Sequence, residues 1–409
     1  MDLLNLTTVN VHYGNCPSYT FSVSPNVLTH SLTHSHRSIP ILFASSNNVS
    51  DCANIMDKEV QTFKIPLDGS DDWIKINADQ KALLRVGHSP EMQKRLVPAV
   101  TSKKLNPIDR ASLLLDSYAL AKANKMPIES VITILKAFTD EDNSIVWSAI
   151  SGVLNALNIL LEEIGGDKYT SFLSFAKTCV MNALNRIGWD PKPTDGHTDK
   201  LTRSTILGLV DTFAWNDPSI VAEARRRYDG HWENPALLPS EYKTTVFKII
   251  LMNGGEKEYE QILKSFYATE DNNEKKYAVF SLGATRNHAL RMKTLDWAVK
   301  SGDVKLQDFF YPISAVSSSA DGTLLAWNYF KDNFAFIKEK LAKASPSLMD
   351  AVIVYSTSRF CTHERVKEIS EFFKANPLPS SERKITQTVE TINTNAALLV
   401  QMKSINLAF

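Results

Sequence analysis

The spacing of apolar residues changes near residue 80, and this change constrains the fold more than any single motif does. Before it, short runs alternate apolar and polar residues, as in 8–13 (TVNVHY) and 19–23 (YTFSV), between clusters rich in Gly, Pro, Asn and Ser. A period of two is typical of strands with one buried face. We therefore predict a small antiparallel β-sandwich over residues 1–79, in which the first two runs pair as a hairpin.

From about residue 89 the apolar residues recur every three or four positions, which is the period of an amphipathic helix. Ile108, Ala111, Leu115 and Tyr118 form one such stripe. Comparable stripes follow at 128–138, 146–161, 172–183, 202–215, 218–229, 240–253, 256–268, 274–283, 286–300, 303–316, 320–343, 346–357, 362–375 and 379–405.

No exact repeat accompanies these segments. Many short helices joined by short turns are nevertheless typical of an α-solenoid of the HEAT or armadillo type. The predicted fold class is thus mainly α: a superhelical domain of helix pairs over residues 80–409, preceded by the small β-sandwich over 1–79. Solenoids curve, and their concave face usually binds something extended.

The composition is that of an ordinary soluble chain, with 44% hydrophobic residues and equal numbers of basic and acidic residues, 45 of each. This balance gives no overall attraction to nucleic acid or to an anionic membrane, and we expect neither partner. The N-terminal segment MDLLNLTTVN does not resemble a signal peptide, and no stretch is expected to reach the roughly 20 apolar residues of a membrane span. Cys16, Cys52, Cys179 and Cys361 form no C-x-x-C pair, so thiols and a cytoplasmic location are expected.

Three histidines, His30, His34 and His36, fall within the segment THSLTHSH. Two histidines four residues apart can share one face of a helix, which is how many zinc sites begin. This segment is polar, however, and lies between predicted strands, without partners that would hold the imidazole rings in place. We therefore predict a solvated loop and no metal site.

The motifs of common catalytic sites are absent from the sequence. His363-Glu364 is followed by Lys367, so no H-E-x-x-H occurs, and there is neither a glycine-rich phosphate loop nor a G-x-S-x-G motif. The basic run Arg225–Arg227 is predicted to be a solvated helix face. We predict no catalytic residue, no metal ligand and no cofactor within this chain.

The most unusual local stretch is 186–197, RIGWDPKPTDGH. Its first glycine ends a predicted helix, its prolines hold the preceding residues extended, and its Asp-Gly pair favours a turn. One interpretation is a stiff connector between helices. The other is a loop that presents Lys192, His197 and the following Arg203 to a ligand.

This stretch also resembles the corresponding segment of the zinc aminopeptidases of the gluzincin family that are like puromycin-sensitive aminopeptidase. Further segments resemble that family in the same order, from roughly residue 39 to 409. They are Trp73 to Asn77 (WIKIN), Leu84-Arg85, Asn106 to Arg110 (NPIDR), Ala137-Phe138, Ser144 to Ser148 (SIVWS), Glu223 to Tyr228 (EARRRY), Ala326-Trp327, Lys331 to Asn333 (KDN), Pro377 to Arg383 (PLPSSER) and Asn395 to Ala397 (NAA). The chain departs from the pattern at Leu84, where the family has Tyr, and at His88, where it has an aromatic residue.

The resemblance implies a domain order of N-terminal β-saddle, thermolysin-like zinc domain, small β-sandwich and helical superhelix, of which this chain matches the last two. The family's zinc ligands, general-base Glu, G-A-M-E-N motif and transition-state Tyr belong to the unmatched half, so none is carried over. In the family, a zinc-bound water hydrolyses the first peptide bond. The implied function is a non-catalytic C-terminal portion, inactive alone, that shapes the peptide-access cavity, whether as an isoform, a partial gene model or a paralogue.

The alternative is a free-standing α-solenoid that binds peptides or a protein, or regulates a full-length aminopeptidase. The expected partners are peptides and a catalytic aminopeptidase domain, and zinc is the cofactor of the full-length family. Arg203 is the candidate for meeting a peptide carboxylate, with Lys192 and His197 beside it. The competing interpretation of Arg203 is a cap or an ion pair within its own helix pair.

Overall fold

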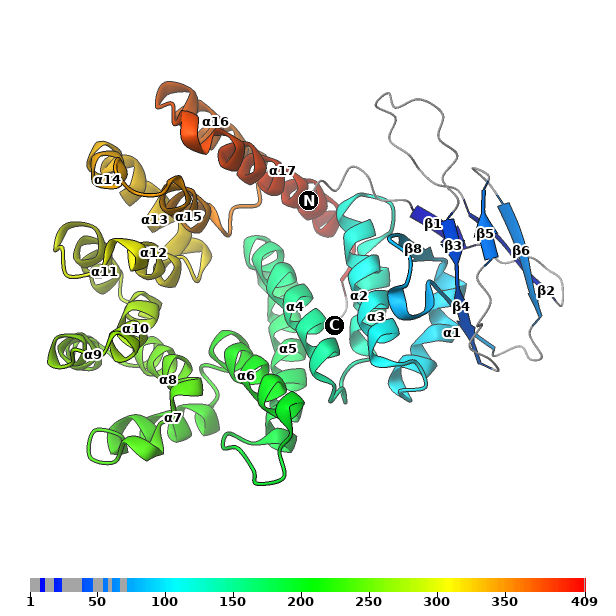
Figure 1. Cartoon of the computed structure of the whole chain (residues 1–409), viewed down its shortest axis with the longest axis horizontal. Coiled ribbons are helices and arrows are strands. Elements are labelled where there is room, and N and C mark those ends of the chain that lie inside the picture. The colour runs from blue at the N-terminus through cyan, green and yellow to red at the C-terminus, as the bar shows by residue number, and fades with distance from the viewer. Residues whose placement is uncertain are drawn as a thin grey trace. The chain divides into compact units, whose positions relative to one another are not determined.

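The computed structural model describes residues 8–11, 18–23, 39–46, 54–57, 61–66, 72–407 and 409. The chain divides into two compact units, and its course is coloured in Figure 1. The first unit comprises residues 1–156, 192–202 and 401–409, and the second comprises 157–191 and 203–400. The histidines of THSLTHSH lie outside the described residues, so the solvated loop stays a prediction.

All the described strands lie in the first unit. They are β1 Thr8–Val11, β2 Ser18–Val23, β3 Ile39–Ile41, β4 Phe43–Ser45, β5 Asn54–Met56, β6 Gln61–Pro66, β7 Ile74–Ile76 and β8 Arg85–His88. Three ladders are antiparallel: β2 with β6, β3 with β5, and β4 with β7. The fourth joins β1 to β8 in parallel, with Val9 opposite Val86.

The predicted hairpin between the first two runs is wrong, because β1 pairs with β8 and β2 pairs with β6. Alternation along a strand specifies which side chains are buried, but it does not specify the neighbouring strand. The partner is set by contacts between residues far apart in sequence. Phe21, for example, lies opposite Phe63.

Helices occupy the chain after the last strand, and the described part of the chain contains no strand beyond His88. They are α1 Pro90–Thr101, α2 Pro107–Lys122, α3 Ile128–Lys136, α4 Ser144–Ile164, α5 Gly166–Ile187, α6 His197–Phe213, α7 Pro218–Gly230, α8 Ser240–Asn253, α9 Glu256–Ala268, α10 Asn272–Ser281, α11 His288–Lys300, α12 Phe310–Val316, α13 Ala320–Asp332, α14 Phe334–Leu341, α15 Pro346–Thr357, α16 His363–Ala375 and α17 Glu382–Ser404. The mainly α fold class is confirmed. The last strand, Arg85–His88, lies beyond residue 79, so the helices begin at Pro90.

Several helices begin where a capping residue precedes a proline. Ser89, Asn106, Asp217 and Ser345 each accept a hydrogen bond from a backbone N–H of the first turn, and each is followed by Pro at the first helical position. The side chain satisfies a donor that the helix leaves unpaired, and proline already has helical φ. These pairs explain why many helix starts are readable from sequence.

Within the second unit, alternate helices form one continuous layer. α8 packs against α10, α10 against α12, and α12 against α15. The intervening helices cover this layer, with α7 on α8, α9 on α10, α11 on α12 and α13 on α15. In Figure 1 the layer of α8, α10 and α12 runs inside the layer of α7, α9 and α11. Two layers of alternating helices are the arrangement of an α-solenoid.

The second unit also closes on itself through the end of α4. Glu162 accepts a hydrogen bond from the backbone N–H of Ala320, at 3.1 Å, and one from Nε of Arg359, at 3.0 Å. The thiol of Cys361 lies 3.9 Å from the carbonyl oxygen of Ile159. The end of α4 thereby contacts the start of α13 and the turn after α15.

α4 is a described helix that is long and apolar enough, by length and composition, to cross a membrane. The expectation that no segment reaches this apolarity is wrong for α4, because its many Ile, Leu and Val residues outweigh its serines and asparagines. Of its most apolar window, 56% is buried inside the structure. Trp147 and Leu154 are fully buried, as in the core helix of a protein that crosses no membrane.

Candidate functional site

Arg203, the predicted peptide contact, belongs to α6, and its side chain contacts the C-terminal end of α5. Its side chain is 4% exposed. Its Nε donates to the carbonyl of Gly188 at 3.3 Å, and its Nη2 donates to the carbonyl of Ile187 at 3.2 Å. The last carbonyls of a helix have no partner within it, and a guanidinium satisfies two of them here. This geometry favours the capping interpretation of Arg203, and its contact with a peptide stays a prediction.

Lys192 and His197, the other two candidates, are exposed and belong to the first unit, whereas Arg203 belongs to the second. The backbone N–H of Lys192 donates to the carboxylate of Asp195 at 2.7 Å, and that of Gly196 donates to Asp199 at 2.8 Å. These bonds shape the loop locally, as the connector interpretation expects. Lys192 lies in the loop before α6 and His197 is the first residue of α6, and the structure does not describe a site that they share with Arg203.

The same unusual stretch contains a buried contact that the sequence did not reveal. Asp190 accepts two hydrogen bonds from Arg227, at 2.9 and 2.6 Å, and one from the hydroxyl of Tyr242, at 2.6 Å. The guanidinium lies 5.5 Å from the ring of Trp189 and 5.1 Å from that of Tyr242. Its Nε also donates to Glu223 at 2.7 Å. Two bonds in parallel to a carboxylate are the strongest geometry available to arginine.

The three arginines of the run Arg225–Arg227 therefore differ in their exposure to solvent. Arg227 is 3% exposed, whereas the side chains of Arg225 and Arg226 are 36% and 53% exposed. The predicted solvated face is thus right for Arg226 and wrong for Arg227, because Arg227 turns toward the loop after α5. The hydrogen bonds from Arg227 hold the pKa of Asp190 below its usual value. The segments GWDP and EARRRY, which each resemble the family, thus contact each other through Asp190 and Arg227.

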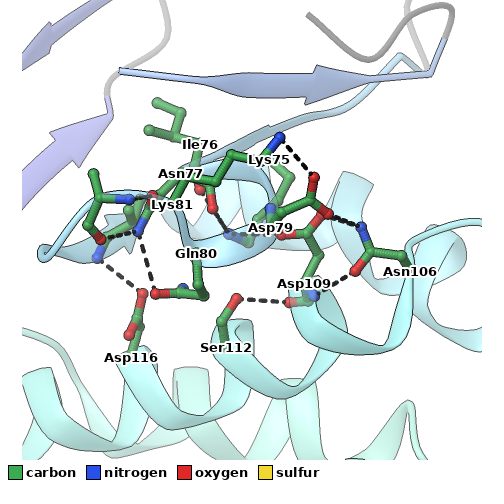
Figure 2. A network of polar contacts seen from close by, with 12 residues as sticks. Lys75, Ile76, Asn77, Asp79, Gln80, Lys81, Asn106, Asp109, Ser112 and Asp116 are labelled. Carbon is green, nitrogen blue, oxygen red and sulfur yellow. Dashed lines mark hydrogen bonds and ion pairs between the residues drawn. The ribbon is translucent and has the colours of Figure 1, made fainter. Parts of the chain in front are cut away.

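A second polar network lies in the first unit, where β7 and the turn after it face α2 (Figure 2). The fully buried ammonium of Lys75 lies 3.6 Å from Asp109 and donates to the carbonyl of Ile76 at 2.6 Å. Asp109 also accepts hydrogen bonds from the backbone N–H of Asp79, at 2.9 Å, and from the amide of Asn106, at 2.8 Å. The carboxylate of Asp109 is thus held from three directions.

The chain turns sharply between β7 and β8 to make this contact. Asn77, Asp79 and Gln80 all have left-handed backbone angles, with φ of 59°, 57° and 54°. Such angles cost free energy for residues other than glycine, so surrounding contacts must hold them. The side-chain amide of Asn77 does so by exchanging hydrogen bonds with the backbone of Ala82, at 2.9 and 3.0 Å.

Asp116, two turns further along α2, completes the network. It accepts hydrogen bonds from Arg85 at 2.7 Å and from the backbone N–H of Val86 at 3.1 Å. Burial raises the pKa of Asp109 and Asp116 and lowers that of Lys75, and the attraction between the opposite charges opposes these shifts. The network joins WIKIN and NPIDR, two further segments that carried the resemblance.

His88, at the end of β8, lies buried beside this network. Neither ring nitrogen has a hydrogen-bond partner within the described residues, and the side chain is 4% exposed. Burial, together with the charge of Lys75, lowers the pKa of His88 to about 3. The imidazole is therefore neutral at pH 7, in a position where the resembling family has an aromatic ring.

The described part of the chain contains no set of side chains that could bind zinc. No group of three His, Cys, Asp or Glu side chains among those residues is placed to hold a metal ion. These described residues therefore do not fit a zinc site.

The fold and its buried networks define a helical array attached to a small β-domain. The sequence profile described as the ERAP1-like C-terminal domain matches residues 73–394. The chain therefore belongs to the ERAP1-like C-terminal domain family.

The similar curated proteins are aminopeptidases. The chain is 26% identical to Aminopeptidase M1 of Arabidopsis thaliana over 88% of its own length and 41% of that protein. It is 24% identical to the alanine/arginine aminopeptidase of Saccharomyces cerevisiae over 87% of its length and 41% of that protein. It is 21% identical to the puromycin-sensitive aminopeptidase of Caenorhabditis elegans over 90% of its length and 39% of that protein. The chain thus spans about two fifths of the length of these relatives.

Proposed function

We propose that this chain is the non-catalytic C-terminal portion of a cytoplasmic zinc aminopeptidase and shapes the cavity through which peptides reach the active site. The observation that carries the proposal is the match to a C-terminal domain over residues 73–394, in a chain that aligns with two fifths of each aminopeptidase. The sequence contains no H-E-x-x-H to bind zinc. Chemistry would come from a catalytic domain, and this chain would contribute access and closure.

The first experiment tests whether the chain is inactive alone. The purified chain is incubated with an aminoacyl fluorogenic substrate, with and without added zinc, beside the Arabidopsis Aminopeptidase M1 as a positive control. We expect turnover by the control only. Zinc-dependent turnover by this chain, lost on chelation and restored by zinc, would overturn the proposal.

The proposed partner is a catalytic aminopeptidase domain, and the first unit offers apolar side chains that such a domain would cover. Leu83, in the turn before β8, is fully exposed, and Ile108 and Leu115 of α2 are 42% and 39% exposed. Ile108 and Leu115 are two turns apart and share one face of the helix. Large apolar side chains left in water are typical of a surface that another domain covers.

A complementation experiment separates this proposal from a free-standing binding module. The catalytic part of a related aminopeptidase, expressed without its C-terminal portion, is mixed with this chain. We expect recovery of peptidase activity by the mixture, and loss of that recovery with Leu83→Asp. A Leu306→Asp variant is the matched control, because Leu306 is an exposed leucine of the second unit. A chain that binds peptides but restores no activity to any such part would support the free-standing module instead.

Arg203, Lys192 and His197 remain the proposed peptide contacts. Arg203 already donates to two carbonyl oxygens at the end of α5, so its side chain supports the fold whether or not it contacts a peptide. We therefore expect Arg203→Ala to lower the thermal midpoint, and Lys192→Ala to lower peptide affinity without that loss. A fluorescent peptide titration beside thermal unfolding measures both, and peptide affinity unchanged in these two variants and in His197→Ala would remove this assignment.

A further inference from the structure

A cleft in the first unit lies along one face of α1 and is unrelated to the candidate contacts above. Its volume is about 450 Å³, within the roughly 300–1,000 Å³ typical of pockets for small ligands. Its described lining residues are Ser46, Asp72, Trp73, Lys94, Arg95, Pro98, Ala99, Ser102 and Lys104. Four of them belong to α1, and Lys94 and Pro98, like Arg95 and Ala99, are four positions apart, so each pair shares one side of the helix.

Positive charge dominates this lining, in which three cations face one carboxylate. Lys94 and Lys104 are exposed, and within the described residues their side chains form no ion pair or hydrogen bond. Arg95 donates to the backbone carbonyl of Asp72 over a long 3.4 Å. Two ammonium groups are thus available beside a guanidinium that points to the same cleft.

The two hydroxyl groups of the lining already donate to protein acceptors. The hydroxyl of Ser46 donates to the carboxylate of Asp72 at 2.6 Å, and the hydroxyl of Ser102 donates to the carbonyl of Pro98 at 2.7 Å. Within the described lining, the donors available to a ligand are the ammonium groups of Lys94 and Lys104. Trp73, 8% exposed, and Pro98 supply apolar surface next to them.

We propose that this cleft binds a small organic phosphate. A phosphate group matches the two lysine ammonium groups because it carries about two negative charges and three acceptor oxygens. The volume exceeds what a bare phosphate fills, and the side of Pro98 and Trp73 suits the carbon skeleton of the ligand. The site is separate from zinc chemistry and from the peptide contacts, so it stands if the proposed function fails.

Calorimetric titration of the whole chain tests the proposal with defined probes. The probes are glucose 6-phosphate and AMP, the uncharged controls are glucose and adenosine, and succinate represents a dicarboxylate. We expect binding of a phosphorylated probe with micromolar to millimolar affinity and no binding of its uncharged counterpart. Raising the salt concentration should weaken binding, because exposed charges are screened.

Charge-reversal variants locate the site. Lys94→Glu and Lys104→Glu are each expected to weaken binding at least about tenfold, which corresponds to about 1.4 kcal/mol. Lys257→Glu is the matched control, since Lys257 is an exposed lysine of α9 without an ion pair in the described residues, and it should change affinity less than about twofold. Thermal unfolding verifies that all three variants are folded.

Three outcomes would overturn the proposal. The first is the absence of binding by both phosphorylated probes at millimolar concentration. The second is equal loss of affinity in Lys257→Glu and the two cleft variants, which would show diffuse attraction to the surface. The third is binding of succinate as tightly as the phosphates, which would make the cleft a carboxylate site.

Discussion

The two charge networks of the molecule lie in different environments, one buried and one partly exposed. In the first unit, Lys75 and Asp109 are almost completely buried, with side-chain exposures of 0% and 1%. In the second unit, Arg227 is buried but its partner Asp190 keeps 61% of its side chain exposed. Each network joins two segments that are far apart in sequence.

The difference appears in the pKa values of the carboxylates. Burial raises the pKa of Asp109, whereas hydrogen bonds from Arg227 lower that of Asp190. A carboxylate that stays in contact with water gains from its partner without losing all of its hydration. A fully buried pair loses most of that hydration, so it stabilises the fold only while both charges are present. The first network should therefore be the more fragile of the two.

The largest effect is expected from removing the cation of the first network. Lys75→Met keeps the length of the side chain but leaves Asp109 buried without its counter-charge, which should cost about 3–5 kcal/mol of unfolding free energy. Urea denaturation measures this loss of unfolding free energy. The double variant Lys75→Met with Asp109→Asn should recover part of this loss, and a double variant as unstable as the single one would contradict the explanation.

Removing the cation of the second network should cost somewhat less. Arg227→Met leaves Asp190 able to turn toward water, so the expected loss is about 2–4 kcal/mol, from the hydrogen bonds and ring contacts of the guanidinium. Arg226→Met is the matched control, because this exposed neighbour should change stability by less than about 0.5 kcal/mol. An equal loss of unfolding free energy in Arg227→Met and Arg226→Met would show that the burial of Arg227 does not make it more important for stability than Arg226.

The pH dependence of the unfolding free energy should also distinguish the first unit from the second, because His88 lies buried beside the network of the first unit. The folded pKa of His88, about 3, is lower than its unfolded value near 6.5. The unfolded chain therefore binds more protons in this window, and stability falls as the pH decreases from about 6.5 toward 3. Between pH 7 and pH 5, the titration of His88 should lower the free energy of unfolding by about 2 kcal/mol.

His88→Phe places an aromatic ring where the resembling family has one and removes the titrating group. Urea unfolding at pH 7 and pH 5 should then show a smaller difference between the two pH values than in the parent chain. An unchanged difference would mean that other groups cause the acid sensitivity.

The smallest effect is expected at the closing contact of the second unit. Glu162→Gln should cost about 1 kcal/mol, because the carboxylate and its partner Arg359 are partly exposed, at 21% and 12%. Hydrogen exchange at the backbone N–H of Ala320 should become faster. Unchanged exchange there would show that this carboxylate does not hold the start of α13.

The helical part of the fold was largely predictable because its causes are local. The segment 256–268 was predicted with the bounds of α9, and 240–253 with those of α8. The segment 320–343 was predicted as one helix, but the structure has two, which meet at Asn333. Periodicity continues across such a break, so it cannot reveal where the backbone changes direction.

The polar networks were not predictable from pattern alone, since buried ion pairs join residues that are distant in sequence. Asp190 and Arg227 are 37 residues apart, and Lys75 and Asp109 are 34 apart by their numbering. A charged residue in an otherwise apolar strand, such as Lys75 between Ile74 and Ile76, was the available indication of a buried partner. The resemblance singled out these segments correctly, although it did not say that they touch.

The contact of Glu162 with Arg359 has a consequence for the order of folding. An open solenoid can nucleate in any repeat and grow by neighbouring contacts. Here a contact spanning 197 residues ties an early helix to a late turn. During synthesis it cannot form until the turn after α15 has left the ribosome, and the loop that it closes is long. This contact is therefore among the last of the second unit that synthesis makes possible, however early α4 itself is made.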